Sequence, residues 1–546
     1  MAQETRKTPT RKGSTAKGGT AKGPAGARAA AKGKGGAKVA GKGAARGRGR
    51  GKAEAHMPDG AGWGWAALAM IAAVTALRIA WNAAEPIPVH FDEAQYWAYG
   101  QELAWGYFSK PPLVGAVIRL FTDIGADTLF WMRLASPLAH GLVAGCLYLL
   151  GAGMFGRATG FWASAAYMAA PGVSVSAMIM STDPVMMAFW ALAMLAWLRA
   201  IRTGALSDWA LMGAAIGLGA LAKYTMLAMP AAALGYGLFS ARGRDLKGAA
   251  VAMGAALLVL APNLAWNAAH DFATVTHVAE DADPGHGYLN PLKLAEFLGA
   301  QFGVIGPVVF LAILAAFWHR RDWREDWRMR LLAWQTGALL FAIVALSFLT
   351  RAQPNWAAPA YVAGCLFAAA WARQYLDHRR WWRALGVQAA VGVVAAGALM
   401  GAAHLYETRA EALPRWGDPF KKMRISEPFC DRALASMFEE GAQVLLADNR
   451  RRLSECMFLG SLTWDEVAVW NPELLPENHH ELVATLREGD QREMLLAVMQ
   501  GGEEIAARFA EARLVDKGEF RTHGDRRYPY ELWILRDFEG YGLTYE

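Results

Sequence analysis

Long apolar runs separated by short polar turns dominate the chain from Trp63 to about residue 403. A helix needs about 20 apolar residues to cross the hydrocarbon of a bilayer. On that scale we expect about eleven membrane spans, near residues 63–83, 129–154, 158–178, 184–201, 208–222, 224–240, 247–266, 296–318, 330–349, 355–373 and 383–403. The pattern predicts an all-α polytopic membrane bundle. The two short runs beside Lys223 suggest broken or tilted helices there.

After residue 403 the pattern changes to shorter, strand-like apolar runs mixed with helical stretches. Residues 443–447 and 466–470 read as strands and residues 433–440 as a helix, which predicts a small α/β soluble domain. Cys430 and Cys456 lie in this region. If the domain is outside the cytoplasm, a disulfide between them is permitted; two buried free thiols are the alternative.

Charge is distributed very unevenly along the chain. Residues 1–56 hold 15 Lys and Arg against Glu4 and Glu54, a net charge of +13, whereas the whole chain carries +7. The tail is too polar to bury a core and is expected to be disordered. We interpret it as a solvated topogenic segment; the alternative is an arm that binds nucleic acid or anionic lipid. No apolar run precedes Trp63, so the first span is expected to be an uncleaved anchor.

The basic residues of the turns indicate which way the spans run. Arg and Lys gather in alternate turns, the ones on the side of the N-terminal tail, and are few in the others. Basic loops stay in the cytoplasm. We therefore expect a cytoplasmic tail (1–56), a membrane domain (57–403) and, after an odd number of spans, a periplasmic domain (404–546), in a bacterial inner membrane.

The first outer loop is the richest in chemistry. It carries Asp92 and Glu93, then Tyr96 and Tyr107 among other aromatic residues, then Lys110 before two prolines. Adjacent carboxylates directly after a span are costly unless they face water, a metal or a substrate. The segment is expected to form amphipathic helices along the membrane surface. The alternative is that the two acids only cap the start of a helix and that the lysine side chain extends to the membrane interface.

Other outer turns add polar groups at the same depth. Asp183 begins one span, Lys223 and Tyr224 lie between two short spans, and Asn355 and Trp356 open another. Asp183 could equally be a helix-capping residue before Pro184, and Trp356 an interface anchor. The loop 267–295 offers His277 and His286, which with Glu93 are candidate ligands of a divalent metal, although their spacing fits no tight metal motif.

Several of these motifs resemble one known family. They are Asp92-Glu93-Ala94-Gln95-Tyr96-Trp97 followed by Gly106 to Leu113, Ser181-Thr182-Asp183-Pro184, Leu221-Ala222-Lys223-Tyr224, Trp266-Asn267 with His270-Asp271, Glu296-Phe297 with Gln301 and Gly306-Pro307, and Pro354 to Tyr361. Over residues 63–375, in order, the chain resembles bacterial GT-C glycosyltransferases of the protein O-mannosyltransferase-like and aminoarabinose (lipid A) transferase-like group.

The resemblance implies transfer of a sugar from a polyprenyl-phosphate carrier to an extracytoplasmic acceptor, by a single inverting displacement. Asp92 matches the essential first-loop acid, with Glu93 as a helper and Asp183 lining the cavity. Lys110 and Lys223 would contact the lipid phosphate. Tyr96, Tyr107, Tyr224, Asn355 and Trp356 would line the substrate site. The resemblance implies no certain cofactor, and it leaves open whether the enzyme uses a divalent metal ion.

The identity of the substrates stays open at this point. Lipid A or lipopolysaccharide, another envelope glycan and a protein are all candidate acceptors, and membrane lipids are expected partners. The main alternative is a transporter or flippase of lipid-linked sugars, a class that usually shows internal repeats; no repeat is visible in this chain. A membrane-anchored binding protein is a third class, which would depend on the basic tail.

Overall fold

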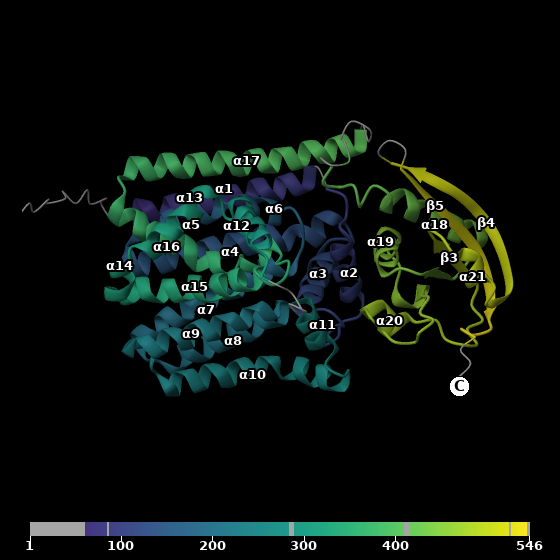
Figure 1. The fold of residues 1–546 in the computed structure, drawn as a ribbon, viewed down its shortest axis with the longest axis horizontal. Helices are drawn as coiled ribbons and strands as arrows, with labels where there is room; N and C mark the ends of the chain where they lie inside the picture. Colours follow the sequence, from purple (N-terminus) through teal and green to yellow (C-terminus); the bar gives the residue numbers. More distant parts are fainter. Residues whose placement is uncertain are drawn as a thin grey trace, which may run out of the picture. The chain divides into compact units, whose positions relative to one another are not determined.

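The computed structural model describes residues 60–84, 87–282, 289–408, 415, 418–522 and 526–542. The expectations about the basic tail, and about His286, fall outside these residues. Up to residue 408 the described chain is helical, and a small sheet domain follows (Figure 1). The predicted combination of a membrane bundle and an α/β domain is therefore confirmed.

The bundle helices vary widely in length, and the long ones are apolar. The first group is α1 (Gly62–Ala84), α4 (Leu129–Phe155), α5 (Arg157–Met168), α6 (Pro171–Ser176), α7 (Thr182–Thr203), α8 (Leu206–Ala222), α9 (Ala228–Phe239) and α10 (Leu246–Ala269). The second is α11 (Ala273–Ala282), α12 (Pro291–Val304), α13 (Pro307–Trp318), α14 (Arg320–Glu325), α15 (Trp327–Ser347), α16 (Ala360–Tyr375) and α17 (His378–Thr408). Short 3-10 turns cover 224–227, 241–243 and 354–357.

Fewer helices than expected are long enough to span a bilayer. Among the described residues, six are sufficiently long and apolar: α1, α4, α7, α10, α15 and α17. The others fall short because a helix rises only about 1.5 Å per residue, and α8, α9 and α16 have 17, 12 and 16 residues. The expected number of eleven spans is not confirmed.

The expected straight span at 296–318 is a bent pair of helices. α12 and α13 meet at an angle of 116° around Ile305 and Gly306. Gly306 has a φ of +87°, a conformation that glycine adopts at little cost, and Pro307 cannot continue the hydrogen-bond ladder of α12. This pair counts as at most one further span.

The soluble domain contains a five-stranded mixed sheet with the order β2-β1-β3-β5-β4. Its strands are β1 (Val444–Ala447), β2 (Val467–Val469), β3 (Met494–Val498), β4 (Phe509–Arg521) and β5 (Arg527–Phe538), and its helices are α18 (Ser426–Glu440), α19 (Arg450–Gly460), α20 (His479–Ala484) and α21 (Gly502–Ala506), with a 3-10 turn at 464–466. β1 pairs in parallel with β2 and β3, whereas β5 is antiparallel to β3 and β4.

The two cysteines of this domain are joined. A disulfide links Cys430 of α18 to Cys456 of α19, which decides between the two alternatives left open by the sequence. Cys146 and Cys365 are free and buried in the bundle.

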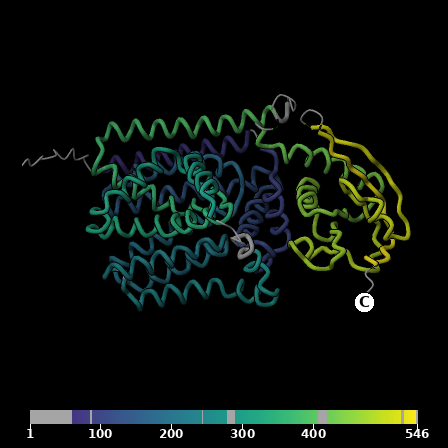
Figure 2. The backbone as a smooth tube through the Cα atoms, viewed as in Figure 1, coloured from purple at the N-terminus to yellow at the C-terminus, as the bar shows by residue number. Residues whose placement is uncertain are grey.

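The first outer loop forms α2 (Phe91–Gln101) and α3 (Leu113–Ile124). In the backbone trace both lie between the bundle helices and the sheet domain (Figure 2). α3 is amphipathic, as expected, but α2 is not an exposed surface helix: Glu93 to Gly100 are all buried. α19 packs against α2, and the Trp464 indole donates a hydrogen bond to the Ala98 carbonyl. The soluble domain thus covers the helix that carries the two adjacent acids.

Candidate active site

Asp92 lies in the first turn of α2, close to its N-cap residue His90. The Nδ1 atom of His90 accepts a hydrogen bond from the Asp92 backbone N–H and lies 3.5 Å from the Asp92 carboxylate. The Asp92 side chain remains 46% exposed. An accessible carboxylate on a rigid helix end can reach a substrate proton, so the geometry is compatible with the base expected at this position.

Glu93 has a different environment from Asp92. It is 1% exposed and pairs with the equally enclosed Arg133 of α4, whose Nε and Nη2 atoms lie 2.8 and 2.7 Å from its two carboxylate oxygens. The backbone N–H groups of Met180 and His90 also donate to this carboxylate. Four donors leave it no open side toward a substrate or metal. The expectation of a catalytic or metal-binding Glu93 does not fit this geometry, and the helix-capping alternative does.

Asp183, Lys223 and Asn355 come together from three separate elements. Asp183 begins α7, Lys223 follows the end of α8, and Asn355 lies in the 3-10 turn before α16. The Lys223 ammonium donates to one Asp183 oxygen at 2.7 Å, and the Asn355 amide donates to the other at 2.8 Å. The N-cap residue of α7 is Ser181, whose side chain makes no capping hydrogen bond. The Asp183 carboxylate binds the side chains of Lys223 and Asn355 and does not cap the helix.

Tyr96 connects this cluster with Asp92. It is buried in α2, and burial raises the pKa of its hydroxyl well above the usual value; the nearby Asp92 and Asp183 carboxylates raise it further. The backbone gives the direct link: the N–H of Met180, three residues before Asp183, donates at 2.7 Å to Glu93, the neighbour of Asp92. The structure therefore brings Asp92 and the Asp183 cluster, which are 91 positions apart in the sequence, to one place.

A hydrogen-bonded chain links the remainder of the first loop to Tyr224, the residue after Lys223. Tyr224, beside Lys223, donates to the Asn263 side chain of α10 at 2.7 Å, and the Asn263 amide donates to the Trp105 carbonyl at 2.7 Å. Lys110 lies in the same loop, in a turn closed by a 3.1 Å bond from the Tyr107 N–H to the Lys110 carbonyl. The loop therefore keeps Lys110 on the side of the protein where Lys223 lies.

Gly106 allows this loop to approach the bundle closely. A Cβ atom at this position would lie 2.3 Å from the Trp266 ring of α10. The Trp266 ring itself stacks on His270, with centroids 4.0 Å apart. The absence of a side chain at Gly106 is what allows the loop backbone to lie against α10.

Tyr107 is packed and does not face an open site. It is fully buried, its hydroxyl donates to the Tyr99 carbonyl at 2.6 Å, and its ring stacks on Tyr99. His479 of the soluble domain contacts the edges of this stack, with centroids 4.9 and 5.0 Å away. The expectation that Tyr107 contacts the substrate does not fit this packing, which fixes the loop instead. Trp356 is half-buried against the bundle core beside the exposed Asn355.

The candidate metal ligands do not form a metal site in the part of the chain that the structure describes. There, no group of three or more His, Cys, Asp or Glu side chains is arranged to hold a metal ion. His277 lies near the Phe108 ring, with centroids 6.0 Å apart. His286 is outside the described residues, and Glu93 is occupied by Arg133.

Some residues of the site were missed by sequence reasoning. Arg133 and Asn263 both lie inside long apolar runs, and ionisable or amide side chains there are costly unless they are paired. This energetic cost could have indicated from the sequence that Arg133 has a buried acidic partner. For His479 the sequence offers none, since only the folded chain brings α20 onto the first loop.

Comparisons with known proteins agree with this architecture. The family model described as dolichyl-phosphate-mannose-protein mannosyltransferase matches residues 109–266. The lipid A galacturonosyltransferase RgtD of Rhizobium johnstonii is 31% identical over 393 residues, which is 71% of this chain and 81% of that protein. Both are transferases, and the transporter alternative finds no support.

Solved structures give the same fold at low sequence identity. The crystal structure of ArnT from Cupriavidus metallidurans bound to undecaprenyl phosphate superimposes with a TM-score of 0.61 at 14% identity, covering 86% of this chain and 98% of that one. The apo structure of ArnT gives a TM-score of 0.56, also at 14% identity, over 87% and 98%. The expected similarity to GT-C enzymes is thereby confirmed, and this chain is an integral-membrane glycosyltransferase that belongs to the GT-C superfamily, in the family that includes RgtD.

Proposed function

We propose that this protein transfers a sugar from a polyprenyl-phosphate carrier to a lipid A-type glycolipid on the outer face of the bacterial inner membrane. The observation that carries the proposal is the Asp183–Lys223–Asn355 cluster, whose segment is hydrogen-bonded to the start of α2 beside the partly exposed Asp92. The names of RgtD and of the undecaprenyl-phosphate complex of ArnT support the acceptor and the carrier. Galacturonic acid is the first sugar to test, because RgtD is named for it.

The proposed reaction is a single displacement at the anomeric carbon. An acceptor oxygen forms the new bond to this carbon while the bond to the carrier phosphate breaks, and polyprenyl phosphate leaves with the electron pair. With a hydroxyl acceptor, Asp92 accepts the proton that the attacking oxygen loses. With a phosphate acceptor there is no proton to remove, and Asp92 orients the acceptor instead.

Lys223 has the chemistry needed for the leaving group. Its ammonium is partly exposed and held by Asp183, so it is positioned before the substrate arrives. A fixed cation beside the phosphate stabilises the negative charge that grows as the bond breaks. Asn355, from the other side of Asp183, keeps this carboxylate and hence Lys223 in place. Lys110 is assigned to the same phosphate.

Glu93 and the tyrosines receive supporting roles in this proposal. The Glu93–Arg133 pair fixes the first turn of α2, and thereby the direction in which Asp92 points. Tyr96, Tyr107 and Tyr224 hold the first loop against the bundle, and Trp356 offers a half-buried ring next to the cluster. No step depends on a metal ion.

The proposal includes a topology. The tail would be cytoplasmic and the soluble domain, from residue 404, periplasmic, with the short helices α5, α8, α9 and α16 completing about eleven crossings. The disulfide between Cys430 and Cys456 supports an oxidising compartment for this domain. Labelling single cysteines at exposed Arg379 and Glu511 with an impermeant reagent in whole cells tests it. Only the cysteine at Glu511 should react. Reaction of the cysteine at Arg379 alone would show that the chain has the opposite topology.

The activity is tested with purified protein, a labelled polyprenyl-phosphate sugar and lipid A. We expect product with the wild type, at least a hundredfold less with Lys223→Met, consistent with losing one charge-stabilising group, and a similar loss with Asp92→Asn if the acceptor is a hydroxyl. Asp123→Asn, an exposed acid of α3, and Lys247→Met, at the start of α10, are matched controls. Full activity of Lys223→Met would overturn the site assignment.

A further inference from the structure

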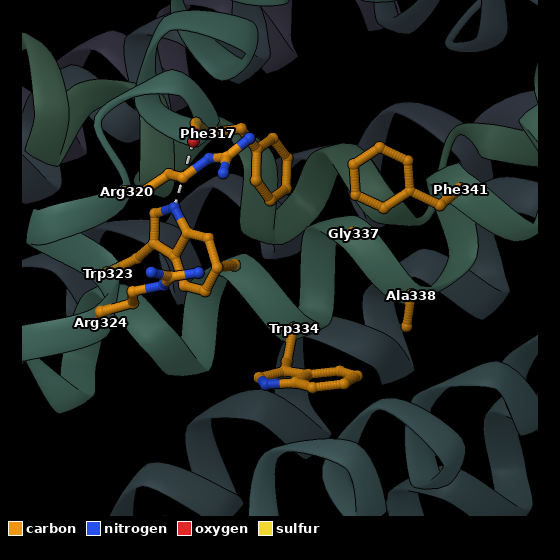
Figure 3. A pocket seen from close by; sticks show the side chains of 9 residues that line it. Phe317, Arg320, Trp323, Arg324, Trp334, Gly337, Ala338 and Phe341 are labelled. Carbon is orange, nitrogen blue, oxygen red and sulfur yellow. Dashed lines mark hydrogen bonds between the residues drawn. The ribbon is translucent and has the colours of Figure 1, made fainter. Parts of the chain in front are cut away.

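A pocket at the other end of the bundle is unrelated to the cluster just described. It has a volume of about 570 Å³ and is lined by the end of α13, by α14 and by residues of α15 up to Phe341. Its walls are aromatic, made by Phe317, Trp323, Trp334 and Phe341, with small residues at 333, 337 and 338. Figure 3 shows these rings around the space, with Arg320 and Arg324 next to Trp323. A volume of this size is typical of ligand pockets.

In the described part of the chain, the two arginines of the pocket have no acidic partner. Among the described residues, no ion pair involves Arg320 or Arg324, which are four positions apart in α14 and so lie on one face of the helix. Their neighbours differ: Arg321 pairs with Glu325 at 2.9 Å and Arg328 with Asp326 at 2.6 Å. Glu325 and Asp326 are thus paired with other arginines. The third acid of the segment, Asp322, accepts a hydrogen bond from the Tyr375 hydroxyl at 3.0 Å. Arg320 and Arg324 therefore remain available to an anion.

The lining of the pocket changes from charged to apolar along the axis of α15. α15 begins at Trp327 beside the arginines and continues past Trp334 to Phe341, so Phe341 lies about 20 Å along the helix from its start. Phe341 is 56% exposed, and Trp334 stacks on the equally outward Phe239, with ring centroids 5.5 Å apart. A ligand here would meet charge at one end and only apolar surface at the other.

The position of the pocket separates it from the active site. α15 is 21 residues long, about 30 Å, and Asn355 follows its far end by eight residues. The arginine end of the pocket therefore lies near the start of α15, whereas the Asp183 cluster lies beyond the far end of this helix. Its occupant does not depend on the transfer reaction proposed above.

We propose that this pocket binds one anionic phospholipid of the surrounding leaflet. Its phosphate lies between Arg320 and Arg324, and one acyl chain runs over Trp334 toward Phe341. Arginine guanidinium groups are suited to bidentate contact with phosphate, and basic pockets between membrane helices bind anionic lipid headgroups. A zwitterionic lipid would fill the apolar part equally well but would leave the two cations less neutralised.

The test uses full-length, delipidated protein and native mass spectrometry with phosphatidylglycerol and phosphatidylcholine of identical chains. We expect one phosphatidylglycerol to bind, preferred over phosphatidylcholine. Arg320→Gln/Arg324→Gln should weaken its binding about 25-fold, from roughly a fivefold effect per arginine near a membrane surface. The control Arg321→Gln/Arg380→Gln removes two exposed charges at the same end of the bundle and should bind like the wild type.

Two further arms separate the outcomes. Ala338→Leu fills the apolar part without changing charge and should also weaken phosphatidylglycerol binding, which keeps the proposal testable if the double arginine variant does not fold. Glycerol phosphate, the headgroup without chains, should not bind measurably. Equal binding of the two lipids by the wild type, unchanged binding by both pocket variants, or binding of glycerol phosphate as strong as that of the lipid would each overturn the proposal.

Discussion

The buried Glu93–Arg133 pair gives the sharpest test of how the active-site helix is held. Arg133 donates two hydrogen bonds to Glu93 and two more to the backbone carbonyls of Ile87 and Pro88. Both side chains are at most 2% exposed. Changing Arg133 to Met would leave a buried carboxylate without its cation, and changing Glu93 to Gln would leave a buried guanidinium without its anion.

The expected magnitude follows from this burial. Removing one partner of a buried ion pair typically costs about 3–5 kcal/mol, whereas removing both is far less costly because no charge is left unpaired. We therefore expect each single variant to lose about 3–5 kcal/mol of unfolding free energy and the double variant to lose less than the sum of the two. Such non-additivity reports direct coupling between the residues.

Unfolding is measured in mixed micelles of a mild detergent and dodecyl sulfate, with tryptophan fluorescence as the signal. The transfer activity of each variant is measured in parallel. The control is the Arg119–Asp123 pair of α3, which is also 2.7 Å long but 38% and 57% exposed; breaking it should cost at most about 1 kcal/mol. The reasoning is refuted if Glu93→Gln costs less than 1 kcal/mol yet abolishes transfer, because Glu93 would then act on the substrate and not on the helix.

Three further predictions concern the soluble domain and the first loop. Replacing Cys430 and Cys456 by serine removes a crosslink over 26 positions and should lower the unfolding free energy by about 3.5 kcal/mol, measured with and without reductant on the wild type. His480 is buried, and burial lowers its pKa to about 3. As the pH falls below about 6.5, this histidine therefore becomes protonated in the unfolded chain but stays neutral in the folded chain. Stability should drop by about 1.4 kcal/mol between pH 7.5 and 5.5 from this residue, and His480→Asn should remove that part of the pH dependence. Gly106→Ala should reduce transfer at least tenfold, because the methyl group would meet the Trp266 ring; unchanged kinetics would show that the loop need not approach α10.

The chemistry of several positions could be inferred from the sequence because burial in a membrane is costly for polar groups. Asp92, Asp183, Lys223 and Asn355 stand out as polar residues at the ends of apolar runs. The alternation of apolar runs likewise predicted the bundle, and the short strand-like runs near 444 and 467 predicted β1 and β2. Each of these signals is local, since it depends only on a residue and its near neighbours in the chain.

The tertiary structure decided what each polar residue does. Asp92 and Glu93 are neighbours with the same chemistry, yet one stays accessible and the other is enclosed by Arg133, which comes from 40 positions away. The pattern cannot distinguish them, because the partner of a carboxylate is set by which helices pack together. The number of spans is not confirmed for a related reason: α16 has only 16 residues and is buried among other helices, so its apolar residues contact protein where a sequence window assumes lipid.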